Sequence, residues 1–135
     1  MGLLYRDEAY RIVGAAMEVY NTLKHGFLEA VYQESLALEM KHRGIPFQEQ
    51  RAIHLSYKGV PLRQTYVADF LAYDKIIIEI KAIKRITPIE EAQLLNYLRA
   101  TRLELGLLIN FGNPHKLEWS RKVLSRNLEQ KQKTD

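Results

Sequence analysis

Residues 66–82 read YVADFLAYDKIIIEIKA, two apolar runs with charged residues inside them. Such runs predict buried strands, in which side chains alternate between the two faces. In the second run the isoleucines at alternate positions share one face, whereas Glu79 and Lys81 share the other. These two charged side chains then lie about 7 Å apart, the length of two strand rises. The stretch therefore predicts a pair of strands with a charged spot on one face of an otherwise apolar sheet.

The first run carries one acid, Asp69, and the register of the pair decides where this acid lies. A hairpin centred on Asp74 places Asp69 opposite Glu79 on one face, with Cβ atoms about 5 Å apart. A two-residue turn at Asp74 and Lys75 would instead pair Asp69 with Ile80 and put the acids on opposite faces. Because Asp-Lys lacks the glycine that such a turn favours, we expect the odd-numbered loop.

Two opposed carboxylates repel each other, and burying both without compensation costs several kcal/mol. A divalent cation resolves this conflict, because hard cations bind oxygen ligands that are held close together. The alternative is that Lys81 forms salt bridges to both Asp69 and Glu79 at the edge of the sheet. On the residues alone, both interpretations stay open.

The rest of the chain surrounds these strands with helices. Apolar residues recur at helical spacing in two segments before the strands, and Thr87-Pro88-Ile89-Glu90 is typical of a helix start with a capping box. The expected order is helix, helix, three strands, helix, strand and a final helix, over residues 7–23, 27–42, 47–57, 62–72, 75–82, 87–102, 103–111 and from about 114. Short turns make the first three strands antiparallel, and the intervening helix allows a parallel crossover to the fourth. The expected fold class is α/β (α+β), a mixed four-stranded sheet flanked by helices.

The composition fits a single domain over residues 1–135 and excludes several kinds of site. The chain has no cysteine, which excludes disulfides, thiolate zinc sites and cysteine nucleophiles. The net charge is +4, and the segment from about residue 114 holds six Lys and Arg against three Asp and Glu, so we expect a basic C-terminal helix or tail. No apolar run reaches the roughly 20 residues that span a bilayer, and the N-terminus lacks a secretory signal, so we expect a cytoplasmic protein.

The charged residues resemble a known signature. Asp69, nine further residues and then Glu79-Ile80-Lys81 is similar to the motif of the PD-(D/E)XK nuclease superfamily, whose αβββαβ core has the order expected above. Residues 26–32, GFLEAVY, fit a GxxExxY pattern, and about residues 8–124 resemble the GxxExxY protein family, an uncharacterised branch of that superfamily. The proline that names the superfamily is replaced by Ala68, whereas the acids and the lysine are present.

The resemblance implies a restriction-endonuclease-like fold, and together with the chemistry of the side chains it implies a metal site. Asp69 and Glu79 would bind Mg²⁺ or Mn²⁺, with the backbone carbonyl of Ile80 as a further ligand. The metal would polarise a phosphate and lower the pKa of a bound water, while Lys81 would orient that water and stabilise the developing charge. Glu29, near the start of the second helix, would be a third catalytic and metal-binding carboxylate; the alternative is a favourable charge at a helix N-terminus.

Other residues would contact the substrate. Gln93 and Tyr97 lie four apart on one helix face and resemble the QxxxY element of exonuclease-like members, where the pair lines the active site. Lys84 and Arg85 would contact phosphates, or else belong to a solvated loop. Tyr32 shares a helix face with Glu29 and would hydrogen-bond within the site, or else pack in the core.

The sequence therefore predicts a Mg²⁺- or Mn²⁺-dependent nuclease that hydrolyses phosphodiester bonds in nucleic acid, with DNA favoured over RNA. The first alternative is a non-catalytic nucleic-acid-binding or adaptor module that retains the fold, and the second is an enzyme of this fold with another phosphate substrate. Because so short a chain has little room for a separate recognition domain, specificity would come from a homodimer or a protein partner.

Overall fold

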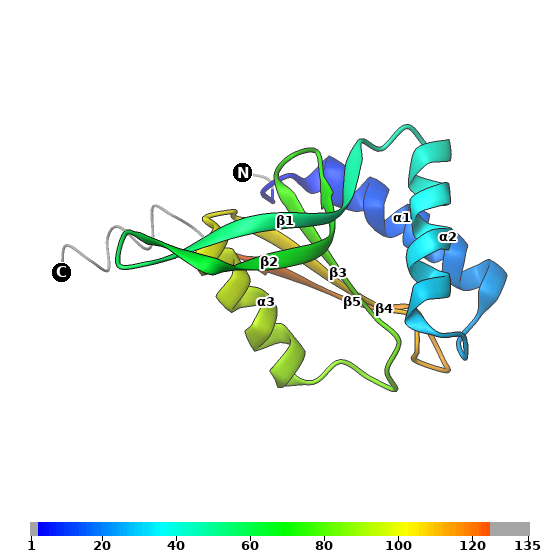
Figure 1. Ribbon diagram of the computed structural model, residues 1–135. Helices are drawn as coiled ribbons and strands as arrows, with labels where there is room; N and C mark the ends of the chain where they lie inside the picture. Colours follow the sequence, from blue (N-terminus) through cyan, green and yellow to red (C-terminus); the bar gives the residue numbers. More distant parts are fainter. Residues whose placement is uncertain (1–2, 125–135) are drawn as a thin grey trace.

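The computed structural model describes residues 3–124, which form a five-stranded sheet with helices on both faces (Figure 1). Helices α1 and α2 cover one face, and α3 covers the other. The elements are α1 (Arg6–Leu23), α2 (Glu29–His42), β1 (Phe47–Tyr57), β2 (Val60–Ala72), β3 (Ile76–Lys81), α3 (Pro88–Thr101), β4 (Leu105–Asn110) and β5 (Glu118–Val123). None of the helices within the described range is both long and apolar enough to cross a membrane.

The sheet has the mixed topology that the sequence predicts. Strands β1, β2 and β3 form an antiparallel meander, β3 and β4 are parallel, and α3 makes the crossover between them. The pairs Phe70–Ile78 and Ala72–Ile76 set the β2–β3 register to the one expected for a hairpin centred on Asp74. The capping box at Thr87 is also present, with Pro88 as the first residue of α3. The α/β fold class is therefore confirmed.

One predicted element is wrong: the segment after β4 forms a fifth strand where we expected a helix and a four-stranded sheet. Residues Glu118–Val123 run antiparallel to β4, all six residues of which are buried. Without β5, β4 would be an edge strand with unpaired main-chain groups, and pairing these groups outweighs the local helical pattern. The part of the basic tail over 125–135 lies outside the described residues.

Two apolar clusters fill the spaces between the sheet and its helices. The isoleucines at positions 76, 78 and 80 pack with α1 and α2, whereas Ile77 packs with Leu94 and Leu98 of α3. Glu79 and Lys81 follow Ile77 on the α3 side, where both are only partly buried. The alternation of β3 therefore places these two charges at the end of the apolar α3 interface, where solvent reaches the sheet.

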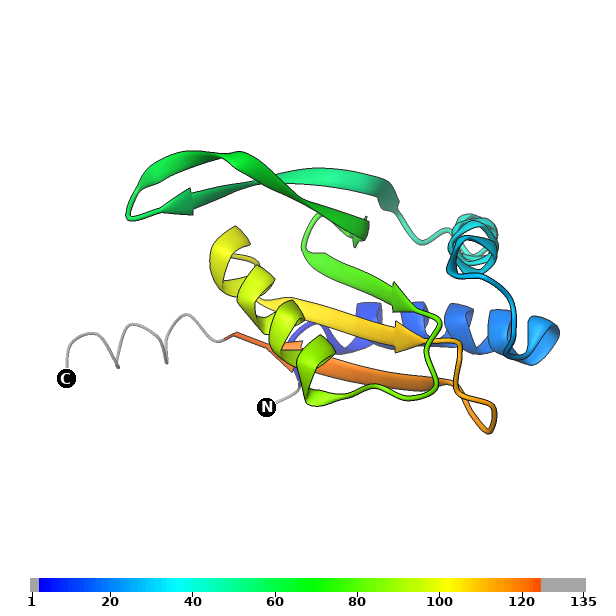
Figure 2. The same ribbon diagram turned by 60° about the horizontal axis from the view of Figure 1, so that its bottom comes forward.

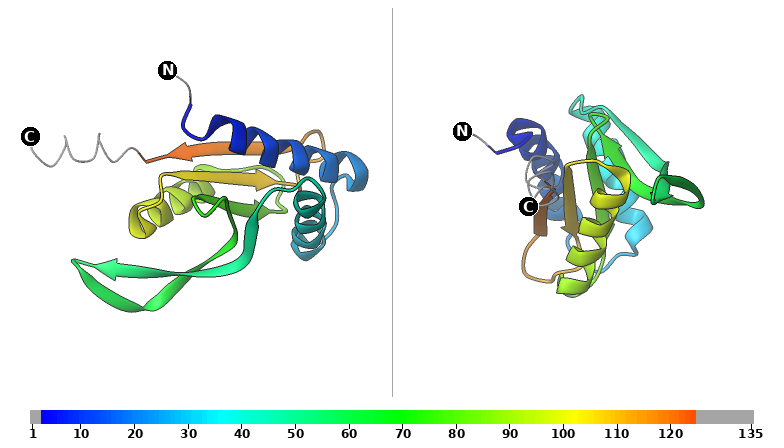
Figure 3. Two further views of the ribbon diagram at one scale, coloured as in Figure 1. Left: turned by 90° about the horizontal axis from the view of Figure 1, so that it is seen from above. Right: turned by 90° about the vertical axis from the view of Figure 1, so that its left-hand side faces the viewer.

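The β1–β2 hairpin bends out of the sheet at Gln50 and Asp69, which lie opposite each other in the register. Gln50 has φ 50°, in the left-handed region. On β2, Tyr66 and Ala68 pack toward α3, whereas Phe70 packs toward α1 and α2, so the strand changes its facing at Asp69. Beyond the bend, residues 51–68 form a twisted two-stranded ribbon that projects past the other strands (Figures 2 and 3). We call residues 51–68 the arm.

Candidate active site

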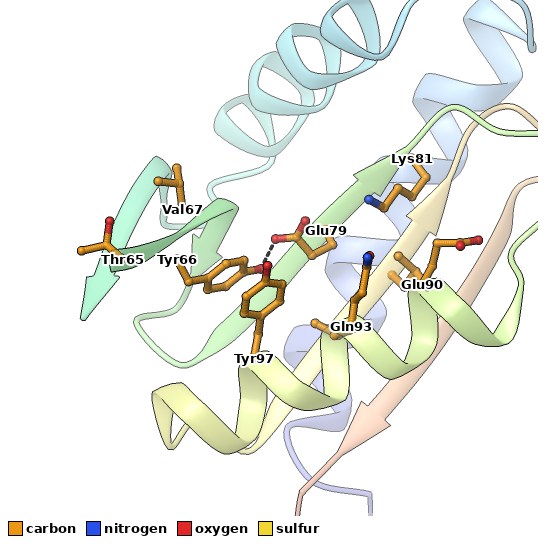
Figure 4. Close-up of a pocket in the computed structure, with 10 residues that line it drawn as sticks. Thr65, Tyr66, Val67, Glu79, Lys81, Glu90, Gln93 and Tyr97 are labelled. Atoms are coloured by element: carbon orange, nitrogen blue, oxygen red, sulfur yellow. Dashed lines mark hydrogen bonds between the residues drawn. The ribbon is translucent and has the colours of Figure 1, made fainter. Parts of the chain in front are cut away.

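A hollow of about 250 Å³ lies on the α3 side of the sheet, where the arm, β3 and α3 meet. Strand β3 contributes Glu79 and Lys81, and α3 contributes Gln93 and Tyr97, so the structure brings together four of the predicted site residues. Figure 4 shows these four side chains pointing into a common space. The remaining lining residues are Thr65, Tyr66, Val67, Glu90, Leu94 and Leu108.

Asp69 lies at the bend, next to this hollow. Its Oδ2 accepts a hydrogen bond of 2.8 Å from the backbone N–H of Ile80. Its backbone carbonyl accepts one of 3.1 Å from Nε2 of Gln33 on α2. The Asp69 carboxylate therefore takes the place of a main-chain acceptor at the point where β2 separates from β3. The last β2–β3 pair is Phe70 with Ile78, so the next residues along the two strands, Asp69 and Glu79, lie opposite each other.

Glu79 is the most perturbed acid of the site. Burial, followed by the negative charge of Asp69, raises the pKa of Glu79 to about 7. The Tyr66 hydroxyl donates a hydrogen bond to Oε1 of Glu79, and this bond and the charge of Lys81 oppose the rise only in part. Burial and the nearby Glu79 charge in turn raise the pKa of Tyr66 far above its ordinary value. At neutral pH this corner of the sheet therefore favours an added positive charge.

Lys81 points into the hollow beside Gln93 (Figure 4). Among residues 3–124 its ammonium forms no hydrogen bond and no salt bridge with Asp69 or Glu79. Its positive charge nonetheless acts on the nearby acids, because it lowers the pKa of Glu79 and of Glu29, although other causes are larger for both groups. The alternative in which Lys81 ties both acids together at the sheet edge is therefore not the arrangement observed.

Glu29 is the first residue of α2, and its side chain is exposed. Desolvation, and then the charge of Asp69, raises the pKa of Glu29, so the two carboxylates lie close enough to interact. Within the described part of the chain, however, no three His, Cys, Asp or Glu side chains form a group that could hold a metal ion. The structure brings Glu29 near Asp69 without gathering a three-carboxylate cluster, so its role as a ligand stays a prediction.

Tyr32 does not reach the hollow. Its side chain is fully buried and stacks on Phe111, with ring centroids 4.8 Å apart. Its hydroxyl donates to the carbonyl of Lys24 and accepts from the N–H of Phe27. The structure therefore has Tyr32 packed in the core, the second of its two expected positions, with its hydroxyl already hydrogen-bonded. Tyr32 instead fixes the loop between α1 and α2, where Gly26 has φ 113°.

Lys84 and Arg85 lie apart from the hollow, on the loop that follows β3. Both are exposed, and together with residues 113–115 they line a separate depression of about 480 Å³. The structure therefore groups them with the β4–β5 loop and not with Glu79 and Lys81. A phosphate contact by Lys84 or Arg85 would lie outside the candidate site.

Three residues that shape the site are not among those expected from the sequence to belong to it. Tyr66 binds Glu79 and stacks on Tyr97 at 3.7 Å between ring centroids, but only the change of facing at the bend brings it there. Glu90 was recognised as a cap and also lines the hollow. Asn110 is fully buried and bonds both the N–H and the carbonyl of Ile83, which holds the chain just after Lys81. The sequence signal for Asn110 is an amide side chain at the end of an otherwise apolar strand.

Comparisons with known proteins place the chain in a family. A family model described as PD-(D/E)XK nuclease superfamily matches residues 6–122, which is most of the chain. No curated protein gave a significant sequence match. Among solved structures, "Crystal structure of SSO0001" superposes with a TM-score of 0.55 and 17% identity, over 97% of this chain and 66% of that one. At so low an identity the likeness shows the fold alone, and the chain spans just under two thirds of that protein's length.

A second solved structure, "Crystal Structure of an alkaline exonuclease (LHK-Exo) from Laribacter hongkongensis", has a TM-score of 0.43 and 16% identity, over 88% of this chain and 81% of that one. So loose a superposition carries no argument. The assignment rests on the family model, whose span includes both acids and the lysine of the site. The chain belongs to the PD-(D/E)XK nuclease superfamily.

Proposed function

We propose that the protein is a divalent-metal-dependent nuclease that hydrolyses phosphodiester bonds, with DNA preferred over RNA, and that it belongs to the GxxExxY branch of the superfamily. The observation that carries the proposal is the corner of the sheet at which Glu79 and Lys81 enter a hollow beside Asp69. Membership of a nuclease superfamily supports a hydrolytic reaction. Gln93 and Tyr97 line the same hollow and would contact the substrate.

The donor set fits a hard divalent cation. Asp69 and Glu79 offer carboxylate oxygens, the carbonyl of Ile80 is the expected third donor, and Glu29 is a further carboxylate nearby. Mg²⁺ and Mn²⁺ prefer such oxygen ligands. The raised pKa of Glu79 supports this assignment, because burial and the charge of Asp69 outweigh the hydrogen bond from Tyr66 and the charge of Lys81. A bound cation would supply Lewis-acid polarisation of the phosphate and a more acidic water.

Lys81 would supply the positive charge that stabilises the transition state. Its ammonium forms no salt bridge with described residues, so a phosphate oxygen or the attacking water can take that place. Removing one preorganised donor of this kind costs about 3–4 kcal/mol of barrier, or roughly 10²–10³ in rate. Because no salt bridge to Lys81 is lost and a bound cation would supply most of the compensation for the acids, the unfolding free energy of Lys81→Met in saturating Mg²⁺ should lie within about 0.5 kcal/mol of the wild-type value.

The test is incubation of the purified protein with single- and double-stranded DNA and RNA in Mg²⁺, Mn²⁺ or EDTA. We expect cleavage of DNA with either metal, none in EDTA, and a loss of roughly 10²–10³ in single-turnover rate for Lys81→Met. A wild-type protein that binds DNA but cuts no strand form with either metal would refute catalysis and favour a non-catalytic nucleic-acid-binding module.

A further inference from the structure

The arm, residues 51–68, is the most exposed part of the sheet. Most of its side chains are exposed, and the apolar ones at 57, 60 and 62 near the turn are 62%, 62% and 41% accessible. The turn itself is Lys58-Gly59, with φ of 48° and 79°, which is the geometry that closes a tight two-residue hairpin. The arm therefore presents a two-stranded ribbon to solvent on both faces near its tip (Figure 3).

The arm is also uniformly basic. Between Glu49 and Asp69 the chain has no acid, and Arg51, Lys58 and Arg63 give the arm a charge of +3. Of the 20 Lys and Arg and 16 Asp and Glu in the chain, 17 and 16 remain outside the arm, so most of the net charge of +4 lies on the ribbon. All three basic side chains are exposed, and none forms a salt bridge with a described residue.

The base of the arm belongs to the candidate active site. Thr65, Tyr66 and Val67 line the hollow that contains Glu79, and the bend that starts the arm is Asp69 itself. A polyanion with one phosphate at Glu79 could extend toward the arm. It would then meet three basic side chains, Arg51, Lys58 and Arg63, and no acidic side chain. Exposed basic groups of this kind bind phosphates by releasing counterions.

We propose that the arm binds duplex DNA beyond the scissile phosphate, with its ribbon in the major groove and its basic side chains on the flanking phosphates; this inference rests on the proposed nuclease function. The major groove of B-form DNA is about 12 Å wide and admits a two-stranded β-ribbon. The major groove of A-form RNA is deep and too narrow for this. The exposed apolar side chains near the turn can contact thymine methyl groups on the groove floor.

The test measures binding in EDTA, so that cleavage plays no part. The triple variant Arg51→Gln, Lys58→Gln, Arg63→Gln is compared with a control that removes the same charge from α1 and α2, namely Arg6→Gln, Arg11→Gln, Lys41→Gln. Each variant is titrated with duplex DNA, duplex RNA and single-stranded DNA of matched length at several salt concentrations. Circular dichroism and melting check that both variants fold.

We expect the arm variant to bind duplex DNA at least tenfold more weakly than the control, with the slope of log K against log salt reduced by roughly two to three. Equal binding of duplex DNA by the two triple variants overturns the proposal. Binding of a protein partner would then be the remaining role for the arm. An equal loss on duplex RNA, or a loss confined to single strands, overturns the assignment to the major groove. Arm-dependent binding without cleavage by the wild type would refute the nuclease proposal alone.

Discussion

Replacing Glu79 by glutamine should stabilise the metal-free protein at alkaline pH. Raising the pKa of Glu79 from 4.5 to about 7 corresponds to about 3 kcal/mol, since each pKa unit is worth about 1.4 kcal/mol. Below pH 4.5 the side chain is protonated in both the folded and the unfolded chain, so it has no effect on stability there. Between pH 4.5 and 7 the unfolded chain releases its proton while the folded chain keeps it, so stability falls as the pH rises. Above pH 7 the loss is complete.

Glutamine keeps the shape of the protonated acid and can still accept the hydrogen bond from Tyr66. In EDTA, Glu79→Gln should therefore match the wild type below pH 4.5 and exceed it by up to about 3 kcal/mol above pH 7. The assay is urea unfolding of both proteins across this range, with Glu34→Gln as a control on the exposed face of α2. Parallel stability curves for wild type and Glu79→Gln would refute the account of a strained, uncompensated acid.

Three further outcomes follow from the same contacts. Asp69→Asn should leave metal-free stability unchanged or slightly raised, because Asn can accept from the Ile80 N–H, and should abolish the rise in melting temperature with Mn²⁺. Tyr66→Phe keeps the ring stack on Tyr97 and loses only the bond to Glu79, so calorimetric titration should show Mn²⁺ affinity reduced about 10–100-fold. Gly26→Ala, at φ 113°, should lower unfolding free energy by about 1–3 kcal/mol in denaturant melts, and an unchanged value would contradict the strain argument.

The sequence predicted those parts of the fold whose causes are local. The β2–β3 register followed from the position of Asp74, and the start of α3 followed from its capping box at Thr87. The fifth strand was not predictable in this way, because Glu118–Val123 is a strand through its pairing with β4 and not through its own pattern. Such a pairing involves residues that only the folded chain brings together.

The same distinction between local causes and contacts made only in the folded chain applies to the candidate site. Strict alternation along β3 placed Glu79 and Lys81 on one face. Helical spacing placed Gln93 and Tyr97 on one face of α3, and the resemblance to the QxxxY element implied that this face lines the site, where the structure has it. Alternation along β2 failed at the bend, so the approach of Tyr66 to Glu79 could not be foreseen. Residues of regular segments, and Asp69 next to the β2–β3 pairing, could be predicted, whereas Tyr66, which lies beyond the bend, required the structure.

The unbonded Lys81 has a consequence for how this site would decay in descendants that no longer cut. Asp69 closes the ladder through Ile80, and Glu79 accepts a hydrogen bond from Tyr66, so selection for folding alone keeps an acceptor at each position, either the acid or its amide. Lys81 forms no hydrogen bond or salt bridge with residues 3–124, so nothing in these contacts resists its replacement once catalysis is lost. A related chain that has lost the lysine but keeps an acid or its amide at positions 69 and 79 is therefore expected to fold without cutting nucleic acid, and the lysine is the residue that reports most directly on activity.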